Sequence, residues 1–70
     1  MRHIAHHVRD FILDVWGGGV SLRLIHHGLC VHWQGEEAAE VYDRLHHEGF
    51  RASAFETLWD EYETVAETYP

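Results

Sequence analysis

Histidines are the side chains of this sequence most able to do chemistry, because a neutral imidazole binds divalent metal ions. The chain has eight of them in 70 residues, and His3 and His7 stand four residues apart, with Asp10 three residues further on. On a helix this spacing places two imidazoles and a carboxylate on one face, a ligand set suited to Zn²⁺ or Ni²⁺. The zincin pattern is absent, because it needs a glutamate directly after the first histidine, whereas here Ile4 follows His3 and Val8 follows His7. A histidine-rich divalent-metal-binding or metal-responsive module is therefore the alternative hypothesis, and no obligatory cofactor is expected.

The other reactive groups do not make a catalytic set. Cys30 and His32 share one face of a predicted strand, but the sequence supplies no orienting acid and no oxyanion hole. The glycine run 17–19 follows a predicted helix and opens a strand, which is the reverse of the order in phosphate-binding loops. We therefore expect no catalytic residues and a protein that is not an enzyme.

Carboxylates are concentrated in the second half of the chain. Residues 36–70 hold ten acidic residues and two arginines, a formal charge of −8, whereas residues 1–35 carry +1. At helical spacing these carboxylates form two stripes, one on each of two predicted helices. The stripes are Glu36, Glu40 and Asp43, and Glu56, Asp60, Glu63 and Glu67. The second stripe has no basic residue three or four positions away, and in the first Arg44 partly relieves Glu40.

Two interpretations of the stripes remain open. A charged, solvated face keeps a small protein soluble. A row of uncompensated carboxylates also resembles the charge spacing of a nucleic-acid backbone, so a protein groove that holds phosphates should accept it. Because solvated helices usually mix charges of both signs, we favour docking to a basic partner. Direct nucleic-acid binding is disfavoured, since the chain has five arginines, no lysine and a formal charge of −7.

A small, acidic, lysine-free single domain resembles the inhibitor proteins encoded by bacteriophages, including the anti-CRISPR proteins. The resemblance lies in size, charge and architecture, and it carries over no functional residue. It implies a protein that binds and inhibits a basic, nucleic-acid-binding protein or complex by mimicking a phosphate backbone. It also implies that the protein acts in the cytoplasm of a bacterial host cell. No apolar run reaches the roughly 18–20 residues that span a membrane, and the N-terminus does not read as a signal peptide.

The expected fold is α+β, with one domain over residues 1–70 and the order α-β-β-α-α. Residues 3–16 predict a helix because their apolar positions recur at helical spacing, with Leu13 off that face as a second contact surface. Residues 20–34 predict a β-hairpin that turns at His27-Gly28. The expected register pairs Leu24 with Val31 and Leu22 with Trp33.

Two further helices are predicted over residues 36–48 and 53–68. Ser53 and Glu56 have the spacing of a capping box at the start of the last helix. Three helices would then cover one face of an antiparallel two-stranded ribbon. Such a ribbon is marginal alone and has free edges, so a four-stranded sheet in a homodimer is one expected assembly and a monomer is the other.

Overall fold

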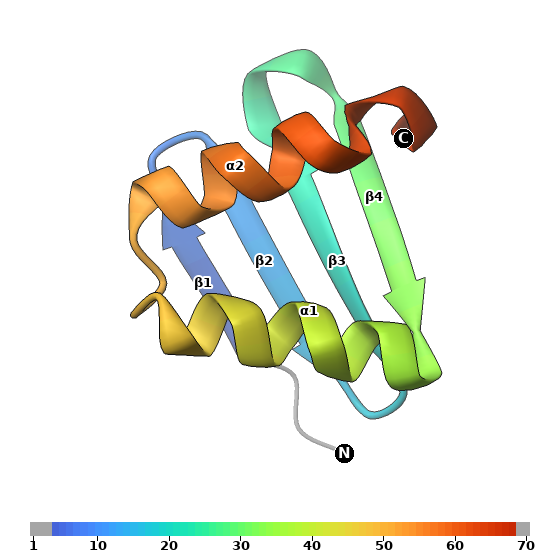
Figure 1. Cartoon of the computed structure of the whole chain (residues 1–70). Helices are drawn as coiled ribbons and strands as arrows, with labels where there is room; N and C mark the ends of the chain where they lie inside the picture. The colour runs from blue at the N-terminus through green and yellow to red at the C-terminus, as the bar shows by residue number, and fades with distance from the viewer. Residues whose placement is uncertain (1–3, 69–70) are drawn as a thin grey trace.

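The computed structural model describes residues 4–68, in which two α-helices cover one face of a five-stranded antiparallel sheet (Figure 1). The strands lie in the sheet in the order in which they follow one another along the chain. They are β1 (Ile4–Val8), β2 (Phe11–Trp16), β3 (Gly19–Leu24), β4 (Leu29–Gln34) and the short β5 (Glu67–Thr68), and the helices are α1 (Gly35–His47) and α2 (Ala52–Tyr62). The predicted α+β class is confirmed, but the sheet has more strands and the fold fewer helices than expected.

The helix predicted over residues 3–16 is wrong, because residues 4–16 form the hairpin of β1 and β2. Val8 pairs with Phe11 across a two-residue turn, in which Arg9 has a φ of 53°. Phe11 and Leu13 then point toward the helices, and Leu13 is fully buried instead of marking a second contact surface. The apolar positions fit both periods, and the β-branched and aromatic residues among them favour the strand.

The hairpin predicted over residues 20–34 is confirmed, with a register two residues away from the expected one. Leu24 lies opposite Leu29 and Leu22 opposite Val31, because a short 3₁₀ turn over Ile25–His27 lengthens the connection. Gly28 closes that turn with a left-handed φ of 62°. A shift of two residues keeps every side chain on its original face, so the predicted core face is unchanged.

Helix α1 lies where it was predicted, but α2 is shorter than expected at its C-terminal end. It ends at Tyr62, and the chain continues through a 3₁₀ turn over Glu63–Val65 into β5, which pairs with the start of β4. The predicted capping box is also wrong, because the residue that precedes α2 is Arg51 and no side chain caps the helix. Ser53 therefore lies inside the helix.

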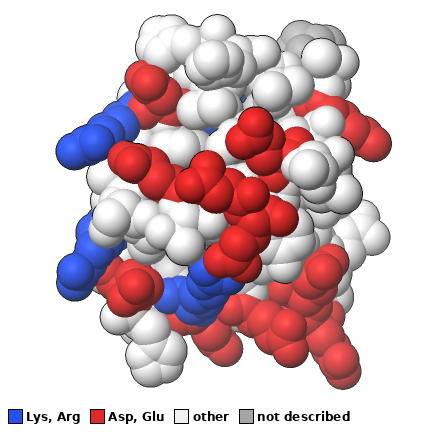
Figure 2. Space-filling model, turned by 45° about the horizontal axis from the view of Figure 1, so that its top comes forward, with Lys and Arg blue, Asp and Glu red and all other residues white. Residues whose placement is uncertain are grey.

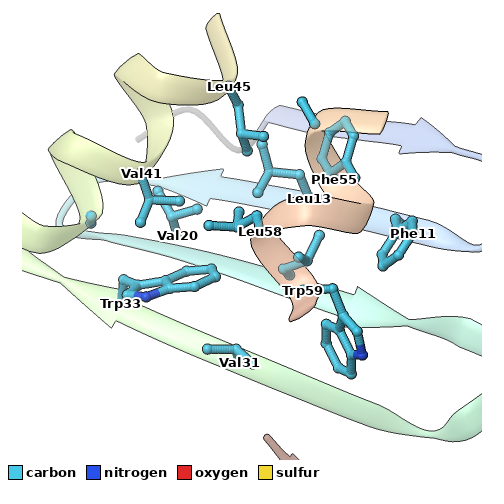
Figure 3. Packing of buried hydrophobic residues seen from close by; sticks show 13 residues of the cluster. Phe11, Leu13, Val20, Val31, Trp33, Val41, Leu45, Phe55, Leu58 and Trp59 are labelled. Atoms are coloured by element: carbon cyan, nitrogen blue, oxygen red, sulfur yellow. The ribbon is translucent and has the colours of Figure 1, made fainter. Parts of the chain in front are cut away.

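The core fills the space between the sheet and the two helices (Figure 3). Its largest fully buried side chains come from both layers and are Leu13, Leu22, Leu45, Phe55 and Leu58. Phe11 of β2 packs on Phe55 of α2 with their ring centroids 6.0 Å apart. Because β1 and β2 add two strands to the predicted ribbon, one chain builds the four long strands that were expected of a dimer. The homodimer stays a prediction.

Candidate partner-binding surface

Both acidic helices lie on the same face of the sheet, so their exposed sides face the same way (Figure 1). Helix α1 begins and α2 ends at the same end of the helical layer (Figure 1). Figure 2 shows acidic side chains over both helices, with the basic side chains toward the left of the view. The two stripes therefore belong to one side of the molecule.

The structure brings together six of the seven residues predicted to bind a partner. Each has an exposed side chain on α1, on α2 or in the turn that follows α2. We call them the acidic helical face: Glu36, Glu40, Asp43, Glu56, Asp60 and Glu63. The seventh, Glu67, lies on β5 opposite Cys30 at the edge of the sheet. A single helical stripe of four carboxylates is therefore wrong, because α2 ends at Tyr62.

Glu56 is not uncompensated as the sequence suggested. The Arg9 guanidinium, which the β1–β2 turn carries to the start of α2, donates to the Glu56 carboxylate with Nη1 and Oε1 3.3 Å apart. Both side chains are exposed, at 71% and 52%, so the pair contributes little stability. It does lower the negative charge at this end of the face. The pairing partner stands 47 residues away in sequence, beyond the reach of a spacing argument on one helix.

Arg44 pairs with Glu61 of α2 rather than with Glu40 of its own helix. The Arg44 Nη1 donates to Glu61 Oε1 at 2.9 Å, and Nη2 donates to Oε2. The hydrogen bond from Arg44 lowers the pKa of the Glu61 carboxyl, and the same hydrogen bond raises the pKa of Arg44. This two-pronged contact joins the two helices that carry the acidic helical face.

Negative charge also gathers at the C-terminal end of α2, where it is electrostatically unfavourable. Asp60 and Glu61 lie in the last turn and Glu63 directly follows it, and the last turn holds no basic residue. The C-terminus of a helix carries a partial negative charge, so carboxylates there are repelled. Arg44 compensates Glu61, but within residues 4–68 no ion pair includes Asp60 or Glu63.

The acidic residues at the start of α1 have a different physical explanation. Glu36 and Glu37 stand in its first turn, where negative charge is attracted to the positive end of the helix dipole. Helix stability alone accounts for them. Asp60 and Glu63 have no such explanation within the described residues.

The predicted metal ligands do not share a helix face. His3 lies outside the described residues. His7 is on β1, with its Nε2 2.9 Å from the Arg9 carbonyl oxygen. Asp10 lies in the following turn, where its Oδ1 is 3.1 Å from His26 Nε2. Across the part of the chain that the structure describes, no three His, Cys, Asp or Glu side chains are grouped to hold a metal ion. Metal binding stays a prediction, but the helix that would have placed these ligands on one face is not present.

The second reactive pair of the sequence, Cys30 and His32, does lie on one strand. The His32 ring is held by its neighbours, because Nδ1 is 2.9 Å from Ser21 Oγ and Nε2 is 3.1 Å from Gln34 Nε2. The same ring stacks on Trp16, with the centroids 5.2 Å apart. These contacts hold the His32 ring on the uncovered face of the sheet.

Comparison of the chain with protein-family models, with curated proteins and with solved structures gave no match. Within the described residues, no helix is both long enough and apolar enough to cross a membrane. Function is therefore inferred from the chemistry of the acidic helical face.

Proposed function

We propose that this chain is a non-enzymatic interaction protein that binds a basic, nucleic-acid-binding protein through its acidic helical face and thereby inhibits it. The observation that carries the proposal is the pair Asp60 and Glu63, which have no ion-pair partner in the described chain and stand at the unfavourable end of α2. Charge that lowers the stability of its own helix is consistent with selection for an external contact.

The arrangement of the two helices suits a groove that normally holds nucleic acid. Helices α1 and α2 lie side by side on one face of the sheet, so they present two rows of negative charge on the same side of the molecule (Figure 1). A groove lined by lysine and arginine would meet carboxylates at positions otherwise filled by phosphates. Association would then be fast at low ionic strength and would weaken with salt. The resemblance to phage-encoded inhibitors of the anti-CRISPR type supports a partner in the bacterial cytoplasm.

Affinity capture from a bacterial lysate tests this function. Immobilised wild-type chain should retain a basic nucleic-acid-binding protein at low salt and release it at high salt. The variant Asp60→Asn/Glu63→Gln should fail to retain it. The matched control is Glu48→Gln/Glu67→Gln, which removes the same formal charge outside the acidic helical face. The control should capture the protein as wild type does.

Two results of this capture experiment would contradict the proposal. If Asp60→Asn/Glu63→Gln captures the same protein in the same amount as wild type, these carboxylates do not make the contact. If both double variants lose capture equally, net charge rather than a defined surface is responsible.

A further inference from the structure

A cavity of about 250 Å³ opens between α1 and the turn that joins β2 to β3. Its lining includes apolar residues from both layers, namely Val15, Trp16, Val20, Ala38, Ala39 and Tyr42. Val20 and Ala38 are buried, Val15, Trp16 and Tyr42 are half-buried, and Ala39 is exposed. The cavity therefore runs from the solvent at Ala39 to the edge of the core.

Small residues and close backbone contacts shape this cavity. Gly18 has a φ of 96°, a left-handed conformation that favours glycine. On α1 the lining positions are the small residues Gly35, Ala38 and Ala39, together with the half-buried Tyr42.

The size and lining of the cavity select the kind of group that it can hold. Pockets for small-molecule ligands typically measure about 300–1,000 Å³, which is larger than this one. No lining residue is charged. A single apolar or aromatic side chain suits such a space, and one anchoring side chain in a pocket is a common centre of protein–protein binding energy.

The cavity lies beside one row of the acidic helical face. The residues of α1 that line the cavity recur at helical spacing. Each acidic residue of the face on this helix comes directly after one of these lining residues in the sequence. Glu36 follows Gly35, and Asp43 follows Tyr42. Glu40 likewise follows Ala39. A partner side chain that enters the cavity is thus flanked by carboxylates, which complement arginine or lysine on the partner.

We propose that this cavity takes one aromatic side chain of the basic partner, with arginine or lysine side chains on either side of it contacting Glu36, Glu40 and Asp43. The basic character of the partner rests on the proposed function, whereas the aromatic anchor rests on the cavity. The anchor adds a contact that salt does not screen, so part of the affinity should survive at high ionic strength.

Titration of the purified chain with three capped synthetic heptapeptides tests the proposal. The first has one phenylalanine between two runs of arginine, the second has alanine in its place, and the third keeps the phenylalanine between runs of glutamate. Affinity and amide chemical shifts are measured by NMR. The variant Ala39→Leu covers the mouth of the cavity, and Ala39→Ser leaves it open as the size-matched control.

On wild type and on Ala39→Ser, the phenylalanine–arginine peptide should bind about tenfold or more tightly than the alanine peptide, because one aromatic ring is removed from water. The glutamate peptide should not bind, and the shifts should include the amides of Val20 and Ala39. On Ala39→Leu, the two arginine peptides should bind equally.

The outcomes that overturn the proposal also separate it from the proposed function. Equal, salt-sensitive binding of both arginine peptides to wild type removes the anchor and leaves the acidic contact standing. A preference for phenylalanine that persists in Ala39→Leu places the anchor elsewhere. Absence of binding by either arginine peptide contradicts both the anchor and the acidic contact.

Discussion

Arg44 of α1 and Glu61 of α2 form a two-pronged ion pair that joins the two helices across their exposed surface. The guanidinium donates to both carboxylate oxygens, with Nη1 and Oε1 2.9 Å apart. The pair removes Glu61 from the carboxylates that are open to a partner.

The Arg44–Glu61 pair predicts a pH-dependent contribution to stability. The hydrogen bond from Arg44 lowers the folded-state pKa of Glu61 below its ordinary value of 4.5. A depressed carboxyl pKa stabilises the fold above the unfolded pKa, and that stabilisation is lost as pH falls through the folded pKa. Glu61→Gln should therefore be less stable than wild type at pH 7, and the difference should shrink toward pH 3. Urea unfolding at both pH values measures it, and a difference that is constant with pH would contradict this role.

The ends of the two helices predict opposite effects for the same chemical change. Removing a carboxylate after α2 by Glu63→Gln should raise the free energy of unfolding, because negative charge is unfavourable there. Glu36→Gln, in the first turn of α1, should lower it. Each effect should be about 0.3–1 kcal/mol at low ionic strength and should fall with salt. Two changes of the same sign in urea unfolding would refute the dipole explanation of Asp60 and Glu63.

The sequence predicts correctly those elements whose apolar residues fit either the helical period or the strand period, but not both. Helix α1 and the β3–β4 hairpin were predicted within a few residues, because alternation and helical spacing are unambiguous there. The segment that forms β1 and β2 fits both periods, so pattern alone did not decide between helix and hairpin. The decisive feature is the turn at Arg9-Asp10, which lacks a glycine and adopts a positive φ at Arg9.

The candidate site was predicted in part, for a similar reason. Spacing along one helix found Asp60 and Glu63 as exposed carboxylates. It did not find that Arg9 reaches Glu56 or that Glu61 takes Arg44, because both contacts join elements far apart in sequence. The spacing also predicted Glu67 on the last helix, but α2 ends at Tyr62. Ion pairs between elements depend on packing, which spacing on one element does not describe.

Gly19 and Trp16 predict a coupled pair of substitutions. A Cβ on Gly19 would lie 2.8 Å from the Trp16 ring. Gly19→Ala should therefore lower the free energy of unfolding by about 1–3 kcal/mol through overpacking. In a Trp16→Ala background the same change should cost much less, because the obstructing ring is gone. A double-mutant cycle by urea unfolding measures the coupling, and purely additive effects would show that the ring does not explain the glycine.

His6 predicts a test of a buried polar atom. Its ring stacks on Phe50 with centroids 4.2 Å apart and planes 8° apart. Its Nε2 is buried and has no hydrogen-bond partner among the described residues. His6→Phe keeps the stacked ring and removes the unpaired nitrogen, so stability should be unchanged or should rise by up to about 1–3 kcal/mol. His6→Ala should destabilise the fold. Equal destabilisation by both substitutions in thermal unfolding would show that the nitrogen makes a stabilising contact.

Competition between the chain and duplex DNA for the captured basic protein tests whether the acidic helical face occupies a phosphate-binding groove. A labelled duplex bound to that protein is titrated with wild type, with Asp60→Asn/Glu63→Gln and with Glu48→Gln/Glu67→Gln. We expect wild type and the Glu48/Glu67 variant to displace the DNA completely, and the Asp60/Glu63 variant to need a much higher concentration. A ternary complex that holds both the chain and the DNA, or equal displacement by all three proteins, would contradict the claim that the acidic helical face occupies the phosphate-binding groove.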